Sequence, residues 1–505
     1  IMTLQVDFQN LQATHHQRTL FPISTRIKLL QQLKQGLISH KQQILNALWE
    51  DLHKSQKQAE VVEFLGIMHE IDYFIQNLRV LAQHRKEYPS MQTINAQVYC
   101  KAEPLGPTAI ITPFNYPINL SLTPLIGCIA AGNPACIKYS SATPQVKDAI
   151  KQLFITVQMP SNYYFVYEGS NDFLMEQTFA LIIFTGSTQT GRQVYLKAAA
   201  KLTKCILELG GFNPCLVDET SDIEMTCNQL LLGKFTNSGQ TCVAPNYLVF
   251  VGGETQFQVF KEKLIQKLST FKDNYEHIVK VINQQKFEQL EQIASHSHVL
   301  TMVFDGQQTY QFDQQRLNSQ RSALLFPPTL IQTDLANPIL TQEIFGPLFP
   351  IIKVDQAEQF FTFFNNNYQN QCKPLSSYIF SKNDKLIHKF KEQISAGAVN
   401  VNECLIYLNT SLPFGGVGES GLGYYHGKYS FDQFSHFKPI MHVGSGPISC
   451  AINNQLTEIS AIPYKKSMGD CLIKTSQFQC KIDFKWLLIV ALLIWALTTQ
   501  ILLVK

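Results

Sequence analysis

Short apolar runs alternate with stretches of helical periodicity from residue 108 onward, and this alternation constrains the fold more than any other feature of the chain. Strands that alternate with helices form a parallel sheet whose two faces are covered by the helices. The first set of apolar runs predicts strands at residues 108–112, 135–139, 164–167, 181–184 and 205–209. The sequence therefore predicts an α/β domain here.

A second alternating set begins at Tyr247 and predicts another domain of the same class. Its further predicted strands are residues 279–282, 325–331, 349–354 and 377–380. Residues 24–87 have the apolar spacing of helices, and Ser24 or Thr25 can cap the first of them. A chain of 505 residues is long enough for two or three domains with sizeable cores.

Composition excludes several classes of protein. The chain is 45% hydrophobic and 16% charged, which is typical of a globular protein, and a net charge of +3 gives no reason to expect a nucleic-acid partner. Its 12 cysteines lack the spacing of a disulfide framework or a zinc site. With no charged-then-apolar segment at the start of the sequence, we expect the folded part in a reducing compartment.

Residues 486–504 form an uncharged apolar run, WLLIVALLIWALTTQILLV. As a helix it would be about 28 Å long, which matches the core of a bilayer. Uniform apolarity and flanking lysines favour a transmembrane anchor over a buried core helix, with residues 449–485 as a linker or gatekeeper segment. We expect a tail-anchored protein with a cytosolic catalytic domain, in the endoplasmic reticulum, or alternatively in the peroxisomal or mitochondrial outer membrane.

Cys242 follows a small polar segment, NSGQT at 237–241, and precedes a predicted strand at 243–251. A lone cysteine is more often a small buried hydrophobe. A polar approach is wrong for a core strand, however, and functional residues are concentrated where loops meet regular elements. Upstream, Glu208 in LELGG adds a carboxylate beside two glycines. A thiol with a base nearby is suited to covalent catalysis.

Five further segments accompany the cysteine motif GQTC (239–242) in a fixed order along the chain. They are TPFNYP (112–117), FTGSTQTGR (184–192), LELGG (207–211), QEIFGP (342–347) and LPFGGVGESGLG (412–423). Any one of the six would be a weak signal, whereas six in order are specific. Over residues 20–445 the chain resembles the aldehyde dehydrogenase superfamily. Its ending YHGKYSFDQFSH (425–436) is similar to the class three branch, which includes membrane-anchored fatty aldehyde dehydrogenases.

The resemblance implies NAD- or NADP-dependent oxidation of medium- and long-chain aliphatic aldehydes to carboxylic acids. Cys242 would attack the carbonyl and form a thiohemiacetal and then a thioester. The Asn115 side chain and the Cys242 N–H would stabilise the oxyanion, and Glu208 would deprotonate the hydrolytic water. From the residues alone, Asn115 could be a turn residue between prolines, and Glu208 could be a helix cap.

No G-x-G-x-x-G segment stands between a predicted strand and a predicted helix, as the usual dinucleotide-binding fingerprint requires. The resemblance instead places the cofactor at Gly186, Ser187 and Gly191, where a predicted strand leads into a helix N-terminus that can bind an anion. An ordinary strand-to-helix turn would have the same pattern. By the same resemblance, Glu343 and Phe345 hold the nicotinamide ribose and ring, although Glu343 alone could be a turn carboxylate.

Two further positions complete the predicted cofactor site. Phe414, in LPFGG, is expected to line the cofactor cleft. Lys138 matches a lysine that reaches the adenosine ribose, in a place where the family usually has K-P-S-E. This chain has serine at position 141, so the carboxylate that would repel a 2′-phosphate is missing and NADP should be tolerated. Phe212 stands where lysine commonly follows LELGG.

The resemblance also divides the chain. It implies a dinucleotide-binding domain at 1–209, with 89–106 as part of an oligomerisation hairpin, a catalytic domain at 210–425 and a return strand for oligomerisation at 426–448. It further implies a homodimer. Two alternatives stay open: an acylating enzyme that uses coenzyme A, which Glu208 disfavours, and a catalytically silent structural subunit, which the intact catalytic residues disfavour.

Overall fold

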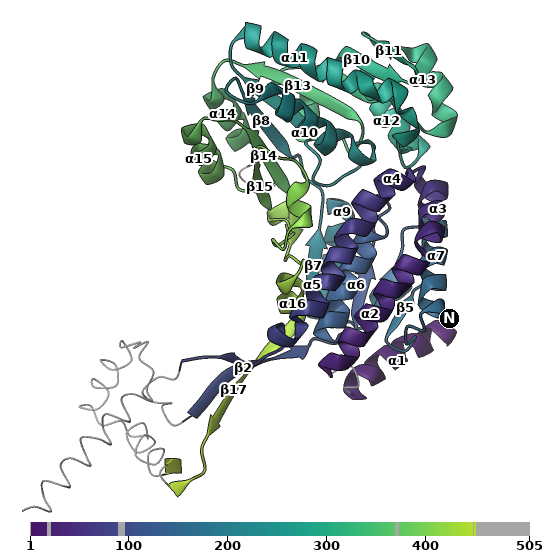
Figure 1. Cartoon of the computed structure of the whole chain (residues 1–505), viewed down its shortest axis with the longest axis vertical. Helices are drawn as coiled ribbons and strands as arrows, with labels where there is room; N and C mark the ends of the chain where they lie inside the picture. Colours follow the sequence, from purple (N-terminus) through teal and green to yellow (C-terminus); the bar gives the residue numbers. More distant parts are fainter. Residues whose placement is uncertain (1, 18–21, 89–95, 369–372, 448, 451–505) are drawn as a thin grey trace, which may run out of the picture. The chain divides into compact units, whose positions relative to one another are not determined.

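A computed structural model describes residues 2–17, 22–88, 96–368, 373–447 and 449–450 of the chain (Figure 1). The described residues form two compact units. The larger unit contains two α/β sheets, and the smaller unit contains a three-stranded sheet.

The first sheet of the larger unit has six strands in the order β16-β7-β6-β3-β4-β5. Their bounds are β3 (Thr108–Ile111), β4 (Ala135–Lys138), β5 (Tyr164–Val166), β6 (Leu181–Thr185), β7 (Lys204–Glu208) and β16 (Gly421–Leu422). β3 to β7 are parallel, and β16 runs antiparallel to β7. All five strands predicted for this domain are confirmed, with every end within one residue of the prediction.

Helices surround this sheet. They are α1 (Met2–Gln17), α2 (Ile23–Ser39), α3 (Lys41–Leu52), α4 (Gln56–Ala59), the π-helical turn η1 (Glu60–Phe64), α5 (Leu65–Leu81), α6 (Asn119–Ala131), α7 (Pro144–Thr156), α8 (Asn171–Glu176), α9 (Thr188–Ala199) and α16 (Lys428–Gln433). The predicted cap of the first helix of 24–87 is wrong, because α2 already begins at Ile23, after Pro22. Proline is well suited to a helix start, since its ring fixes φ and the missing N–H is not needed there.

The second sheet has eight strands in the order β11-β10-β12-β13-β9-β8-β14-β15. Their bounds are β8 (Pro214–Asp218), β9 (Tyr247–Val251), β10 (His298–Phe304), β11 (Gln307–Thr309), β12 (Thr329–Gln332), β13 (Leu348–Val354), β14 (Ser376–Phe380) and β15 (Ala398–Val401). Six strands are parallel, and β10 and β11 add an antiparallel edge.

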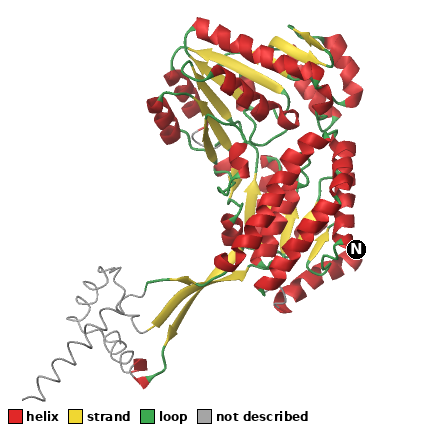
Figure 2. Ribbon diagram, in the orientation of Figure 1, coloured by secondary structure: helices red, strands yellow, loops and turns green. Residues whose placement is uncertain are grey.

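Helices lie on both faces of the eight-stranded sheet (Figure 2). They are α10 (Ile223–Phe235), α11 (Glu254–Leu268), α12 (Gln284–Ser295), α13 (Gln314–Gln320), α14 (Ala357–Tyr368) and α15 (Asp384–Gln393). Side chains of β9 alternate between two hydrophobic clusters, with Tyr247 and Val249 in one and Leu248 and Phe250 in the other. A strand buried on both faces shows this alternation.

Two predicted strands of this domain need correction. Residues 279–282 form a loop, because their backbone bonds to side chains: Gln240 Nε2 donates to the Lys280 carbonyl at 3.0 Å, and the Ile282 N–H donates to Gln240 Oε1 at 3.0 Å. The strand predicted at 325–331 begins only at Thr329. Two prolines precede it, and proline has no N–H to donate to a sheet.

The smaller unit contains β1 (Arg85–Lys86), β2 (Ala96–Pro104) and β17 (Ser435–Val443), in the order β1-β2-β17. Lys438 Nζ pairs with Glu103 Oε1 at 2.6 Å across β17 and β2. The predicted segment 89–106 therefore contributes a strand that pairs with the predicted return segment 426–448, and 89–95 lie outside the described residues. The role of this sheet in oligomerisation stays a prediction.

Among the residues that the structure describes, no helix is long and apolar enough to cross a membrane. The predicted transmembrane segment 486–504 lies outside these residues, as does the predicted linker apart from residues 449–450.

Candidate active site

Four segments that carry predicted site residues leave one edge of the six-stranded sheet. The parallel strands β3, β4, β6 and β7 are in register, so their carboxyl ends lie side by side. Asn115 follows β3, Lys138 ends β4, Ser187 follows β6 and Glu208 ends β7. Open α/β sheets bind ligands at this edge.

Cys242 lies in a short turn that precedes β9. The strand predicted to begin directly after it starts only at Tyr247. Upstream of the cysteine, residues 237–239 all have left-handed φ angles of 56°, 52° and 69°. A Cβ atom at Gly239 would lie 2.3 Å from the Gly346 carbonyl oxygen, so only glycine fits where the cysteine loop meets the QEIFGP segment.

Side chains from neighbouring strands hold the cysteine turn by its carbonyl groups. Asn213, directly before β8, donates through Nδ2 to the carbonyl oxygens of Cys242 at 2.7 Å and Ala244 at 3.0 Å. The Tyr378 hydroxyl of β14 donates to the Val243 carbonyl at 2.5 Å. The backbone of the cysteine is therefore fixed to the core of the eight-stranded sheet.

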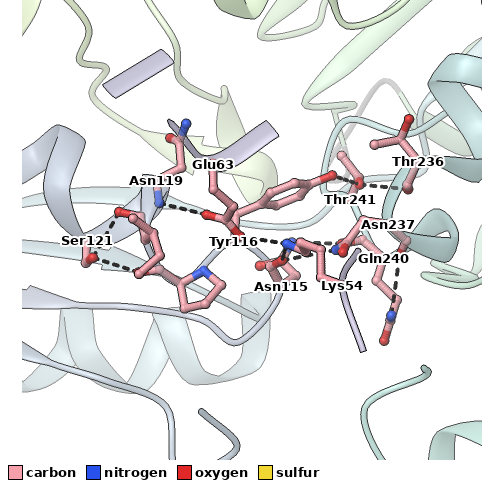
Figure 3. A network of polar contacts seen from close by, with 12 residues as sticks. Lys54, Glu63, Asn115, Tyr116, Asn119, Ser121, Thr236, Asn237, Gln240 and Thr241 are labelled. Atoms are coloured by element: carbon pink, nitrogen blue, oxygen red, sulfur yellow. Dashed lines mark hydrogen bonds and ion pairs between the residues drawn. The ribbon is translucent and has the colours of Figure 1, made fainter. Parts of the chain in front are cut away.

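Asn115 is brought to the same loop. Its side chain is buried, and Nδ2 donates to the Gln240 carbonyl at 2.9 Å (Figure 3). A side-chain amide has two N–H groups, and this hydrogen bond uses one of them. Next in sequence, the Tyr116 hydroxyl lies 2.5 Å from Thr241 Oγ1. Two consecutive residues after β3 thus bond to two consecutive residues before Cys242.

Glu208 is 1% exposed, and neither of its carboxyl oxygens has a hydrogen-bond partner among the described residues. Burial raises the pKa of this carboxyl well above its ordinary value of 4.5. An ionised carboxylate without partners is costly in such surroundings, so the protonated form is favoured. Raised pKa values of this kind are found in general acids and bases.

The Cys242 residue keeps some exposure to solvent, but the surroundings of its thiol raise its pKa to about 12. Burial is the largest cause, and the carboxyl groups of Glu208 and then Glu343, when ionised, add to it. The backbone N–H groups of Cys242 and Val243 act in the opposite direction. The structure therefore brings the predicted nucleophile, the predicted base and Glu343 within electrostatic reach of one another.

A cavity of about 180 Å³ has Cys242 on its wall. Most of its lining is aliphatic or aromatic, and none of the described residues that line it is Lys, Arg, Asp or Glu. The apolar residues are Val61, Val62, Leu120, Leu232, Val243, Leu405, Ile406, Leu408 and Phe414. Phe414, expected in the cofactor cleft, thus lines the cavity that holds the cysteine. His426 also lines it, stacked on Phe414, and burial lowers the His426 pKa to about 4.

Glu343 reaches the two glycines of LELGG. The Gly211 N–H donates to Glu343 Oε1 at 3.2 Å, and a Cβ atom at Gly210 would lie 2.5 Å from both carboxyl oxygens. The glycine therefore leaves the space that Glu343 occupies. Burial raises the pKa of Glu343 to about 7, opposed by the Gly211 N–H and by the charges of Lys286 and Lys234. Phe345, at a left-handed φ of 43°, packs edge-on against Phe114.

Comparison with known proteins identifies the family that this site belongs to. The model of the Aldehyde dehydrogenase family matches residues 8–440. The chain belongs to the aldehyde dehydrogenase family.

The aldehyde dehydrogenase is 34% identical over 448 residues to the rat protein "Aldehyde dehydrogenase family 3 member A2", with 86% of this chain and 88% of that protein covered. It is 34% identical over 424 residues to "Aldehyde dehydrogenase, dimeric NADP-preferring" of the dog, with 82% and 89% covered. These names agree with the predicted class three branch. The enzyme is an NAD(P)-dependent aldehyde dehydrogenase.

Solved structures share the fold. A substrate-bound Staphylococcus aureus AldH superposes with a TM-score of 0.80 at 31% identity, covering 91% of this chain and 99% of that one. The Methanocaldococcus jannaschii glyceraldehyde-3-phosphate dehydrogenase GapN, complexed with NADP, gives a TM-score of 0.73 at 25% identity, with 87% and 94% covered.

The residues of the aldehyde dehydrogenase fit NAD or NADP. After β6, Gly186 leads into α9, and Ser187 caps this helix by accepting a hydrogen bond from the Thr190 N–H at 3.3 Å. Gly191 is buried in its first turn. The start of a twelve-residue helix can bind a pyrophosphate. Half-buried Lys138 lies at the end of β4 and adds positive charge at the same sheet edge.

Sequence reasoning missed several residues that shape this aldehyde dehydrogenase site. Asn213 and Asn246 anchor the loops on either side, and Asn246 Nδ2 donates to the Gln342 carbonyl at 2.9 Å. Lys54 and Glu63 form a fully buried pair, and Lys54 donates to the Asn115 carbonyl (Figure 3). Asparagine next to a strand gave a weak signal of a loop anchor. A lysine and a glutamate on a helical stretch gave none, because their burial depends on tertiary packing.

Proposed function

We propose that this aldehyde dehydrogenase oxidises medium- and long-chain aliphatic aldehydes to carboxylic acids. The observation that carries the proposal is the apolar cavity with Cys242 on its wall. Each methylene buried there would contribute about 0.8 kcal/mol to binding. A charged group on the aldehyde would find no charged partner in the lining, which disfavours phosphorylated or carboxylated substrates.

Cys242 is the nucleophile in this proposal. Its thiolate adds to the aldehyde carbon, and the carbonyl oxygen becomes the oxyanion of a thiohemiacetal. The second N–H of Asn115 and the Cys242 backbone N–H are the donors for that oxygen. Because the thiol has a pKa of about 12 in this structure, its proton must pass to solvent water before the thiolate can attack.

Glu208 is also the base for the second half of the reaction. Bound NAD or NADP supplies the acceptor for the hydride. Glu208 then takes a proton from the water that hydrolyses the cysteine thioester and releases the acid. A buried carboxyl near the thiol favours water over coenzyme A as acyl acceptor, so the acylating alternative is the weaker candidate. The silent-subunit alternative is disfavoured because Asn115 and Cys242 are held together by hydrogen-bonded loops.

The test is turnover of straight-chain aldehydes from acetaldehyde to hexadecanal, with NAD and with NADP, and with detection of the acid product. We expect kcat/KM to rise with chain length until the cavity is filled. Cys242→Ala is the matched control, which should fold and lose at least about 10⁴-fold of kcat. Acid formation that requires coenzyme A, or a preference for short polar aldehydes, would contradict the proposal.

We further propose that residues 486–504 anchor the enzyme in a membrane, with the catalytic residues on the cytosolic side, and the endoplasmic reticulum as first choice. The support is the uncharged apolar run in the sequence. A homodimer is proposed through the sheet of the smaller unit, because β17 lies at an edge of that sheet in the described part of the chain. Edge strands offer unpaired backbone groups to a second chain.

A further inference from the structure

We propose that the buried pair Lys54–Glu63 positions Asn115 for oxyanion stabilisation, so that both are positioning residues for the reaction. The inference rests on the proposed role of Asn115 as an oxyanion donor. It follows from hydrogen bonds that join this pair to the loop after β3, and that join this loop to the cysteine loop (Figure 3).

The pair lies between helices, away from solvent. Lys54 precedes α4, and Glu63 belongs to the π-helical turn η1. Both side chains are 0% exposed, and Lys54 Nζ lies 2.6 Å from Glu63 Oε1. Burial lowers the pKa of Lys54 and raises that of Glu63, and the attraction between the two side chains opposes both shifts. Irregular π turns are frequent near functional sites.

Both members of the pair bind the same short segment of backbone. Lys54 Nζ donates to the Asn115 carbonyl at 2.8 Å. Glu63 Oε2 accepts a hydrogen bond from the Asn119 N–H at 2.9 Å. The segment that carries Asn115 is therefore held at both ends by one pair.

The segment is also joined to the cysteine loop by a closed set of hydrogen bonds. Asn237 Nδ2 donates to the carbonyl of Asn115 and to that of Gln240, each at 3.1 Å. Asn115 Nδ2 donates to the same Gln240 carbonyl at 2.9 Å. Lys54 and Asn237 thus both donate to the Asn115 carbonyl. This arrangement orients the side-chain amide of Asn115 relative to Cys242.

Stability alone does not account for this pair. Removing two charges from water costs several kcal/mol per ion, and well-packed apolar side chains are often as stabilising as a buried ion pair. Geometry gives a better account, because an oxyanion donor must lie within about 0.5 Å of its working position. A misplacement of about 1 Å can lower a rate about 100-fold.

The experiment is a mutant cycle in the full chain. Lys54→Met/Glu63→Gln removes both charges and the bond to the Asn115 carbonyl, and the glutamine can still accept from the Asn119 N–H. We expect kcat to fall about 10- to 100-fold, while KM for aldehyde and cofactor changes less than about twofold. Asn115→Ala alone should lower kcat about 10²- to 10³-fold. Combining all three changes should lower kcat no further than Asn115→Ala does.

That non-additivity separates positioning from a general loss of stability. Arg26→Met is the control, because Arg26 is also buried and donates to a backbone carbonyl, that of Ala130, at 3.0 Å. Its effect on kcat should be small and should multiply with that of Asn115→Ala. Should Lys54→Met/Glu63→Gln not fold, Lys54→Gln/Glu63→Gln replaces it in the same cycle with the same expected non-additivity, because two neutral amides leave no unpaired buried charge.

The outcomes distinguish this inference from the proposed function. An unchanged kcat in the pair variant, or an effect that multiplies with Asn115→Ala, overturns the positioning role and leaves the oxyanion role of Asn115 intact. Full activity of Asn115→Ala overturns the positioning role of the pair and the oxyanion role of Asn115. The expected result is a lower kcat in the pair variant and no further loss when the pair changes are added to Asn115→Ala. That result supports the positioning role of the pair and the oxyanion role of Asn115.

Discussion

The carboxylate of Glu343 accepts a hydrogen bond of 3.2 Å from the backbone N–H of Gly211, three residues after the buried carboxyl of Glu208. The segment LELGG therefore carries the proposed base, Glu208, at the end of its strand. Its glycine Gly211 binds Glu343, which is proposed to contact the cofactor. The two carboxyl groups have separate surroundings: Glu343 has an N–H donor and two lysines that lower its pKa, whereas burial is the only cause acting on Glu208.

Gly210→Ala should weaken cofactor binding while sparing the thiol. The added Cβ atom would lie 2.5 Å from the Glu343 carboxylate, so Glu343 must move. We expect KM for NAD and NADP to rise about tenfold, which corresponds to about 1.4 kcal/mol. The rate at which iodoacetamide alkylates Cys242 in the free enzyme should change less than twofold. A variant with a normal cofactor KM would show that Glu343 does not bind the cofactor.

Glu208→Gln should form the thioester and hydrolyse it slowly. The expected result is a stoichiometric burst of reduced cofactor, followed by a steady state about 10²- to 10⁴-fold slower than that of the wild type. Stopped-flow absorbance of the reduced cofactor measures both phases. A missing burst would instead assign Glu208 to the attack step, where it would serve as the base for the Cys242 thiol.

The same substitution should stabilise the fold at neutral pH. Burial raises the Glu208 pKa above 4.5, so between pH 4.5 and the raised pKa the folded state holds a proton that the unfolded state has released. The free energy of unfolding of the wild type therefore decreases as pH rises through this window. Glutamine stays neutral, so Glu208→Gln should match the wild type in Tm near pH 4.5 and exceed it increasingly above. For Glu343→Gln the corresponding gain should level off near pH 7.

Much of the six-stranded sheet could be predicted from the sequence, because its strands are buried on both faces and appear as continuous apolar runs between helices. Residues 279–282 have the same apolar character and are a loop, since their backbone partners are Gln240 and other residues far away in the chain. β8 and β15 were not predicted. Apolar periodicity predicts which side chains of a segment are buried. It does not predict which groups form hydrogen bonds with the backbone of that segment.

Some residues of the candidate site could likewise be predicted from the sequence, and others could not. The order of the motifs led to Cys242, Glu208 and Asn115, because each stands in a short segment of unusual composition. Phe414 lines the cavity of Cys242, and its expected place beside the cofactor stays a prediction. Its position depends on the turn that carries it back toward Tyr425, with which it forms an antiparallel bridge. Lys54 and Glu63 could not be predicted, since their burial depends on tertiary packing.

Ser141→Glu should shift the preference from NADP toward NAD. Ser141 is exposed in the loop after β4, at the position where the family usually has a carboxylate that repels a 2′-phosphate. Two negative charges near each other at a protein surface repel by about 1–4 kcal/mol, so the ratio of kcat/KM for NADP to that for NAD should fall about tenfold or more. Ser141→Gln is the control, because glutamine has the size of glutamate without its charge. It should leave the ratio within about twofold of the wild-type value. An unchanged ratio in Ser141→Glu would mean that another residue distinguishes the two cofactors.

Removal of residues 481–505 should release an active enzyme from membranes. Every proposed catalytic residue lies upstream of this segment, and the apolar run at 486–504 lies within it. The intact chain should sediment with membranes and resist alkaline carbonate, while protease added to sealed vesicles should digest the catalytic domain. Leu493→Arg places a charge in the middle of the run at a cost of about 2.5–3.5 kcal/mol and should weaken insertion without changing kcat. Carbonate extraction of the intact chain would refute the anchor, and protection of the catalytic domain from protease would refute the cytosolic orientation.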